Sequence, residues 1–376
     1  MQKPVNILIT GGHVTPAIAT IEEIKKRYPK WQITFVGRKH SLEGVKVLSE
    51  EYRLIKDLNI PFIPITAGRL KRDGGLGALV ALLKVPVGLI QAFAAVMQVR
   101  PDVVVSFGGY VALPVALGAR ILGVRVITHE QTTRPGLANR IIARIADHIC
   151  ISFPETKKMI TGGNRITLTG LPLRSAVLNP PEQKPFPVPE GKPILFIVGG
   201  STGSVSINNV VFASLPTLVK YYTVVHQVGR LSIAHGEAVA RDLPKTLEKY
   251  YIPRAYFSAA EYSWAMHNAE IVIGRSGANT VTEIALSGAV AICIPLPWSA
   301  HNEQFHNAAF LVGGGSVILP QDKLTPSSLI KTVNEVTATI GARKLKAGAL
   351  AMLLPADGAK RLVDVIEHMI TPEKHP

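Results

Sequence analysis

Residues 5–13 read VNILITGGH, a short apolar run rich in β-branched residues that ends in two glycines. Residues 194–201 read ILFIVGGS, which repeats the pattern half a chain length later. Helical patterns follow, from about Thr15 and from about Ser206. A strand, a glycine turn and a helix make half of a βαβ unit, the building block of open parallel sheets. The repeat therefore predicts one doubly wound α/β sheet in each half of the chain.

A second pair of motifs supports this duplication. The apolar run Val103–Ser106 leads into Gly108-Gly109-Tyr110, and the run Ile271–Gly274 leads into Arg275-Ser276-Gly277. Open α/β sheets bind their ligands at the carboxyl ends of the strands. We therefore expect these two loops and the two glycine pairs to be the ligand-binding loops.

Composition indicates the domain limits. Residues 179–193 are rich in proline, which is typical of a semi-rigid linker. We expect a first domain over residues 1–178 and a second over residues 194–355. A last helical pattern, over residues 356–370, either closes the second domain or crosses back to complete the first.

Charge is unevenly distributed along the 376 residues. Of 41 Lys+Arg and 26 Asp+Glu, residues 1–180 contain 24 and 11, and the remainder contains 17 and 15. The excess predicts an anionic partner for the first half. With 47% apolar and 18% charged residues the chain is not a disordered one. Two distant cysteines exclude a disulfide framework, and the short apolar start predicts a cytoplasmic protein without a signal peptide.

The stretch Leu76–Met97 is almost entirely apolar and follows several basic residues. Its length approaches the roughly 20 residues of a membrane span, although Lys84 and Pro86 interrupt it. Three interpretations stay open: buried helices, an apolar patch with a basic rim that lies on a membrane surface, or a span. Nucleic-acid binding is disfavoured because the basic half carries this stretch and few aromatic residues.

The segment 275–283, RSGANTVTE, opens a helix after a strand. Unpaired backbone N–H groups and the positive end of the helix dipole suit a diphosphate, and Arg275 could add a charged contact. Glu283 would accept hydrogen bonds from ribose hydroxyls. The structural alternative is a capping box, in which Thr280 and Glu283 only satisfy backbone donors.

Two further segments of the second half are candidates. Residues 199–204, GGSTGS, combine glycines that allow close approach of a ligand with hydroxyls that donate to phosphate or sugar oxygens. Residues 295–307 contain several hydrogen-bonding side chains, as sites for hydroxyl-rich ligands do. The alternatives are a tight turn for the first segment and a solvated helix start for the second.

In the first half, two glycine loops and His129-Glu130-Gln131 are expected at equivalent strand ends. His13 and Glu130 are the candidates for a general base. The chain has no Asp-x-Asp, His-Glu-x-x-His or Gly-x-x-x-x-Gly-Lys-Ser/Thr motif, so metal-hydrolase and P-loop functions are disfavoured. The first glycine turn is too short for the dinucleotide-binding motif, which disfavours a dehydrogenase.

Seven motifs together resemble the MurG family, the family 28 glycosyltransferases that add N-acetylglucosamine to the lipid-linked muramyl-peptide precursor of peptidoglycan. The resemblance covers nearly the whole chain. The motifs are Gly11-Gly12-His13-Val14-x-Pro16-Ala17, Gly108-Gly109-Tyr110-Val111, His129-Glu130-Gln131, Thr169-Gly170-x-Pro172-x-Arg174, Gly199-Gly200-Ser201-x-Gly203, Arg275-Ser276-Gly277-Ala278-x-Thr280-Val281-x-Glu283 and Gln304-x-x-Asn307-Ala308.

The resemblance implies a GT-B fold, with two Rossmann-like domains facing across a cleft. It implies that the second domain binds UDP-N-acetylglucosamine and the first binds lipid I, the undecaprenyl-diphosphate-linked MurNAc-peptide. The donor-binding residues would be Arg174, Ser201, Ser276, Gly277, Asn279, Thr280, Glu283, Glu303 and Gln304. The acceptor-binding residues would be Gly11, Gly12, Thr15, Gly109, Tyr110 and Gln131, and the catalytic residues His13 and Glu130, with His13 preferred as the base.

The implied reaction is an inverting displacement at C1 of the sugar by the C4 hydroxyl of MurNAc, which yields lipid II. Backbone donors and a helix dipole, rather than an Asp-held metal, would stabilise the leaving UDP; a free divalent cation stays possible. The protein would lie peripherally on the cytoplasmic face of the membrane, against its anionic surface. The alternatives are a related transferase from UDP-sugars to another lipid, and a non-catalytic membrane-surface homologue that binds nucleotide sugars.

The chain departs from the family pattern at four positions. The first loop usually reads Gly-x-Gly-Gly-His, whereas here Thr10 precedes the glycine pair. Thr132 stands where Asn is usual, Thr202 where Gln is common, and Glu303 where Gln or His is usual. The first two changes affect the acceptor side, and Glu303 affects the sugar contacts.

Overall fold

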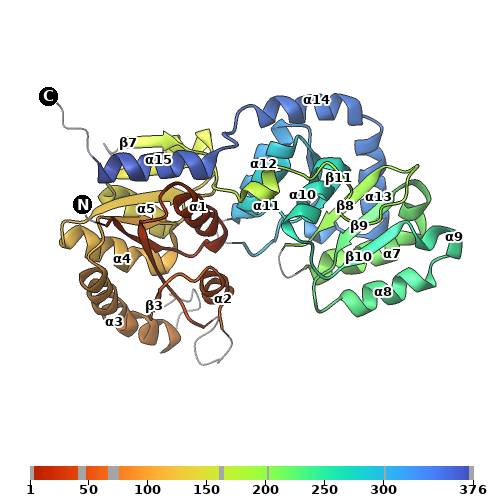
Figure 1. Cartoon of the computed structure of the whole chain (residues 1–376). Coiled ribbons are helices and arrows are strands. Elements are labelled where there is room, and N and C mark those ends of the chain that lie inside the picture. The colour runs from red at the N-terminus through yellow and green to blue at the C-terminus, as the bar shows by residue number, and fades with distance from the viewer. Residues whose placement is uncertain are drawn as a thin grey trace. The chain divides into compact units, whose positions relative to one another are not determined.

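The computed structural model describes residues 4–40, 48–66, 76–160, 165–200, 203–299 and 302–371, without the side chains of Glu50 and of residues 76–85. The chain divides into two compact units. The first comprises residues 1–174 and 357–376, and the second comprises residues 175–356 (Figure 1). Each unit is described by itself.

The first unit contains a parallel sheet of seven strands within the described residues, in the order β3-β2-β1-β4-β5-β6-β7. The alternation of side chains divides its core into two layers: Ile7 and Ile9 face one side of the sheet, and Leu8 faces the other. The strands are β1 Asn6–Thr10, β2 Gln32–Gly37, β3 Phe62–Pro64, β4 Val103–Ser106, β5 Arg125–Glu130, β6 His148–Ile151 and β7 Arg165–Leu168.

Helices cover both faces of this sheet (Figure 1). On one face, α1 (Val14–Arg27) lies beside α15 (Gly358–Ile370), whose Leu362 and Ile366 join the core layer of Ile7 and Ile9. Helix α15 comes from the end of the chain and thus belongs with the first sheet. The other elements are α2 Glu50–Asp57, α3 Leu76–Val99, α4 Gly109–Ile121, α5 Leu137–Ile145 and the 3-10 helix Pro154–Met159; α3, α4 and α5 lie side by side on the second face.

The second unit repeats this plan. Within the described residues its parallel sheet has six strands, in the order β10-β9-β8-β11-β12-β13. The strands are β8 Ile194–Val198, β9 Thr223–Gln227, β10 Tyr251–Arg254, β11 Ala269–Gly274, β12 Val290–Cys293 and β13 Val317–Ile318. The helices are α6 Ser175–Leu178, α7 Val205–Tyr221, α8 Ile233–Asp242, α9 Lys245–Glu248, α10 Ala259–Asn268, α11 Ala278–Ser287, α12 Glu303–Gly313, α13 Pro326–Thr337 and α14 Ile340–Ala351. The predicted pair of doubly wound α/β sheets is confirmed.

Strand order places the predicted loops at one kind of position in both units. In the first unit β2 and β3 lie on one side of β1, and β4 to β7 lie on the other, so the strand order reverses between β1 and β4. In the second unit it reverses in the same way between β8 and β11. The loops that follow these four strands are the two glycine pairs and the two loops at 108–110 and 275–277 that the sequence indicates. Crevices at such reversal points, at the carboxyl ends of the strands, are where open α/β sheets bind ligands.

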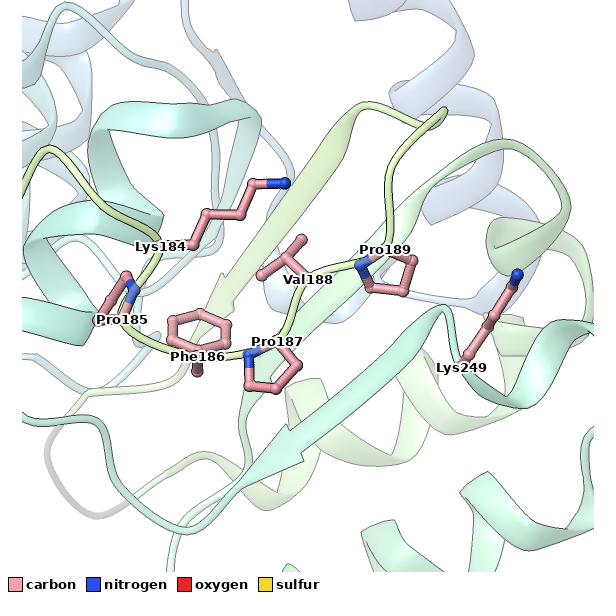
Figure 2. A pocket seen from close by; sticks show the side chains of 7 residues that line it. All are labelled: Lys184, Pro185, Phe186, Pro187, Val188, Pro189 and Lys249. Carbon is pink, nitrogen blue, oxygen red and sulfur yellow. The ribbon is translucent and has the colours of Figure 1, made fainter.

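The proline-rich stretch packs onto the second unit. Phe186 is buried, and its ring lies 5.6 Å from that of Phe257 and 5.5 Å from that of Trp264. Lys192 lies with its Nζ 3.5 Å from the centre of the Tyr250 ring. Residues 184–189 and Lys249 line a shallow pocket on this unit (Figure 2). Contacts with aromatic rings therefore hold Phe186 and Lys192 of the expected linker against the second unit.

Helix α3 contains the whole of the long apolar stretch, with Pro86 inside it. Of its described side chains, Ala92 and Val96 are buried in the core, whereas Ile90 is 70% exposed. No helix in the described part of the chain is both long and apolar enough to cross a membrane. The stretch is therefore partly a core helix and partly an exposed apolar surface.

Candidate active site

The two glycine loops of the first unit contact each other directly. The Gly12 N–H donates to the carbonyl oxygen of Gly108, at 2.9 Å. Gly109 adopts a φ of +80°, and a Cβ added to Gly11 would lie 2.7 Å from Phe107 Cβ. Both positions therefore require glycine, and the bare backbone permits close approach of a ligand at the reversal point.

His13 stands at the N-terminus of α1, beside these loops, and its side chain is exposed. Its Nδ1 lies 3.3 Å from the carbonyl oxygen of Phe107. Because a carbonyl can only accept, Nδ1 carries the hydrogen in this arrangement and Nε2 is the basic nitrogen. The loop therefore presents an oriented proton acceptor at the surface. Thr15, half-buried, lies in the first turn of the same helix.

Glu130 is buried at the end of β5. Its Oε1 accepts hydrogen bonds from the backbone N–H of Thr132 (2.9 Å) and from Thr132 Oγ1 (2.7 Å), and its Oε2 accepts one from Asn139 Nδ2 (2.6 Å). Burial raises the pKa of this carboxyl, while these hydrogen bonds and the nearby His13 act in the opposite direction. Thr132, which departs from the family pattern, thus has a local role: it holds Glu130.

Gln131 and Tyr110 complete the predicted acceptor residues. Gln131 is fully buried, and its Nε2 donates to the carbonyl oxygen of His129 at 2.9 Å. Gln131 therefore stabilises the backbone of residues 129–131. Tyr110 is half-buried in the first turn of α4, and the guanidinium of Arg38 lies 5.2 Å from the centre of its ring. Arg38 follows β2 and was not singled out from the sequence, because its proximity to Tyr110 depends on strand order.

In the second unit, α11 begins at Ala278, with Gly277 as its N-cap residue and no side-chain cap. The capping box considered for Thr280 and Glu283 is therefore absent, because Glu283 lies in the second turn, beyond reach of the N-cap. Glu283 instead accepts a hydrogen bond from the Tyr262 hydroxyl, at 2.9 Å. The helix N-terminus, with Asn279 half-buried in its first turn, keeps its unpaired N–H groups for an anion.

The loop before α11 is held by α12. Ser276 is buried; its Oγ donates to the carbonyl oxygen of Gln304 at 2.8 Å, and its own carbonyl accepts from Asn307 Nδ2 at 3.3 Å. Gln304 Oε1 accepts from the N–H of Leu296 at 3.0 Å. Glu303 and Gln304 are half-buried in the first turn of α12. The structure thus brings Ser276 and Gln304 into contact.

Arg275 has a different role from the one considered for it. Its guanidinium is buried and donates to the carbonyl oxygen of Ile294 (3.1 Å), to Ser204 Oγ (2.8 Å) and to Gln321 Oε1 (2.6 Å). Burial lowers its pKa. Arg275 therefore links four segments of the second unit, and both of its terminal guanidinium nitrogens donate to protein acceptors rather than to an anion.

The glycine loop after β8 is positioned from β9. Gly203 adopts a φ of +79°, and an added Cβ would overlap the carbonyl oxygen of Val228. Gln227 Nε2 donates to the carbonyl oxygen of Gly200 at 3.0 Å. Gln227 was missed from the sequence, since nothing local marks it. Ser201 and Thr202 of this loop lie outside the described residues, and half-buried Arg174 ends the first unit.

Among the described residues no three His, Cys, Asp or Glu side chains are grouped so as to hold a metal ion. The sequence expectation that no metal is required therefore stays a prediction.

Both halves of the chain match domains of one family of known proteins. The N-terminal domain model of glycosyltransferase family 28 matches residues 10–151, and the C-terminal domain model matches residues 194–362. Among solved structures, a glycosyltransferase of kitacinnamycin has the same fold, with a TM-score of 0.72 at 18% identity over 98% of this chain and 100% of the other. Both halves are thus those of a GT-B glycosyltransferase.

More similar proteins narrow this class. The crystal structure of MurG from Acinetobacter baumannii has a TM-score of 0.73 at 26% identity and covers 97% of this chain and 99% of its own. The UDP-N-acetylglucosamine–N-acetylmuramyl-(pentapeptide) pyrophosphoryl-undecaprenol N-acetylglucosamine transferase of Borreliella burgdorferi is 31% identical over 87% of this chain and 85% of its own length. The protein of that name from Legionella pneumophila strain Paris is 31% identical over 96% of both chains. The chain therefore belongs to the MurG family of family 28 glycosyltransferases.

Proposed function

We propose that this protein transfers N-acetylglucosamine from UDP-N-acetylglucosamine to the C4 hydroxyl of MurNAc in lipid I, with inversion at C1, to make lipid II for peptidoglycan. Family membership supports the reaction. The observation that carries the donor site is the uncapped N-terminus of α11, at the reversal point between β8 and β11, with the Glu283 carboxylate one turn inside the helix.

On the donor side, the backbone of residues 276–280 binds the diphosphate and Glu283 accepts the ribose hydroxyls. The unpaired N–H groups and the helix dipole stabilise the charge that develops on the departing UDP, so a protein-held metal is not required. Glu303 and Gln304 bind the sugar hydroxyls, and Ser201 and Arg174 contribute to binding of the diphosphate.

On the acceptor side, His13 is the general base that takes the proton of the MurNAc C4 hydroxyl. Its basic Nε2 is presented at an exposed loop, whereas the Glu130 carboxylate accepts three hydrogen bonds from its own surroundings. Glu130 therefore shapes the loop. The glycine backbones of Gly11, Gly12 and Gly109 admit the diphosphate of lipid I, with Tyr110 beside them.

The face formed by α3, α4 and α5 lies against the anionic cytoplasmic surface of the membrane. Apolar side chains protrude from all three helices, and α5 adds exposed arginines. We call these residues the membrane face: Val87, Leu89, Ile90, Met97, Ile121, Leu122, Leu137, Arg140 and Arg144. Apolar insertion and charge attraction together make a peripheral attachment, which brings the first unit to its lipid substrate.

The reaction is tested by UDP release from UDP-N-acetylglucosamine. Release should require a polyprenyl-diphosphate MurNAc acceptor, and UDP-glucose and UDP-galactose should be poor donors. Glu283→Ala should lower kcat/KM by about 10- to 100-fold, which is the usual effect of losing hydrogen bonds to a charged group. Glu335→Ala, an exposed glutamate on α13, is the matched control. Turnover with another lipid acceptor would indicate a different transferase, and donor binding without turnover a non-catalytic homologue.

Membrane attachment predicts a second measurable effect. Ile90→Asp should weaken binding of the full chain to phosphatidylglycerol vesicles about tenfold, because it removes an inserted side chain and adds a negative charge. Binding of the unaltered chain should also weaken as salt rises. Leu231→Asp, at a 94% exposed position of the second unit, is the control and should change nothing. Equal losses in both variants would contradict the membrane face.

A further inference from the structure

Tyr262 connects α10 to the donor segment of α11. Its hydroxyl donates to Glu283 Oε2 at 2.9 Å, and the side chain of Thr280 lies close enough to lower the pKa of the same hydroxyl. Thr280 and Glu283 are both residues to which we assign donor contacts. The Tyr262 hydroxyl is thus bonded to the second turn of α11, the helix assigned to donor binding, and lies near its first turn.

The surroundings of Tyr262 hold its ring in place. The ring packs edge-on against that of Phe196 in β8, with centroids 5.3 Å apart. Helix α10 starts with a complete capping box, in which Ser258 and Glu261 satisfy each other's backbone N–H groups. The pKa of the hydroxyl is well above its usual value, because the group is withdrawn from water and faces the Glu283 carboxylate. The hydroxyl therefore stays a donor at every physiological pH.

We propose that Tyr262 is a positioning residue for the donor nucleotide, which orients the Glu283 carboxylate toward the ribose and thereby sets the preference for ribonucleotides. This inference rests on the proposed ribose contact of Glu283. A carboxylate offers about four lone-pair sites, so one anchoring bond is compatible with accepting ribose hydroxyls. Because the Glu283 rotamer is fixed before the nucleotide binds, less side-chain entropy is lost on binding.

If Tyr262 positions Glu283, removing its hydroxyl should reduce discrimination between UDP and 2′-deoxy-UDP rather than weaken the binding of both equally. In the full-length protein, Tyr262→Phe should weaken UDP binding about tenfold, the effect of one hydrogen bond to a charged partner. Binding of 2′-deoxy-UDP should change less, because that ligand lacks the 2′ hydroxyl and can donate to Glu283 only from its 3′ hydroxyl. The dissociation constant of 2′-deoxy-UDP divided by that of UDP, both measured by calorimetry, should therefore fall.

Two matched variants separate positioning from structure. Tyr222→Phe removes another hydroxyl of the second unit, one that lies 2.7 Å from Thr337 Oγ1, and should leave the ratio unchanged. Glu283→Gln should reduce the ratio at least as much as Tyr262→Phe. Thermal unfolding of each variant reports the stability change separately from discrimination.

The possible outcomes separate the positioning role of Tyr262 from the ribose contact of Glu283. A reduced ratio in Glu283→Gln with an unchanged ratio in Tyr262→Phe overturns the positioning role alone. Equal weakening of UDP and 2′-deoxy-UDP by Tyr262→Phe likewise reduces Tyr262 to a structural residue. An unchanged ratio in Glu283→Gln overturns the ribose contact itself, and the inference with it.

Discussion

Replacing His13 with Asn is expected to lower kcat by about 10²- to 10⁴-fold, the usual contribution of a positioned general base. The amide nitrogen of Asn can still donate to the Phe107 carbonyl, as Nδ1 does in the histidine. What it cannot supply is the basic Nε2. The KM for UDP-N-acetylglucosamine should stay nearly constant, because His13 lies in the first unit, whereas the donor residues other than Arg174 belong to the second. Steady-state kinetics with a saturating lipid acceptor measures both quantities.

Glu130→Gln is the variant that decides between the two candidate bases. A Gln oxygen still accepts from Thr132, and the Asn139 amide can rotate to meet the new Gln donor, so the loop should keep its shape. We therefore expect a fall in kcat much smaller than that of His13→Asn. A folded Glu130→Gln protein without turnover, together with an active His13→Asn protein, would transfer the role of base to Glu130.

Gly274→Ala is expected to have the largest effect on stability. Gly274 ends β11 and pairs with Val198 of β8, and an added Cβ would overlap the Val198 carbonyl oxygen. Because that atom is sheet backbone, it cannot move aside as a side chain tip can. Overpacking of this kind costs about 1–3 kcal/mol, which should lower the melting temperature by roughly 3–10 °C.

The same substitution should weaken UDP binding more than tenfold, since it separates the two strands that carry the donor loops. Calorimetry measures the affinity, and thermal unfolding measures the stability. Gly348→Ala in α14 is the control: its added Cβ meets no atom within 4 Å, and alanine favours a helix. A Gly274→Ala protein with normal stability and normal UDP affinity would show that the β8–β11 spacing is unimportant.

Local sequence patterns were sufficient for much of the architecture. An apolar run that ends in glycine and is followed by a helical pattern can be recognised within about 15 residues. The strands β1, β4, β8 and β11 were predicted in this way, and strand order then placed their four loops at the reversal points. The same reasoning indicated the helix at residues 356–370 without deciding which sheet it covers, because that depends on core contacts with α1.

Side-chain roles were predicted less well where they depend on distant partners. The spacing of Thr280 and Glu283 is that of a capping box, yet the helix begins at Ala278, so that interpretation was wrong. Arg275 precedes a helix N-terminus that is expected to bind an anion, yet its guanidinium donates to acceptors on three other segments. The first case is decided by where the helix begins, and the second by acceptors on elements that are remote in sequence.

The sequence by itself determined the two parallel sheets, the glycine loops at their strand ends and the resemblance to the MurG family, because each follows from short-range patterns of residue type. Only the tertiary structure decided that Glu130 is buried beneath Thr132 and Asn139, that His13 presents Nε2 at the surface, and that Tyr262 holds Glu283. The physical reason is that direction and burial of a side chain depend on which helices and strands pack together. That packing joins residues many positions apart, and no local pattern records it.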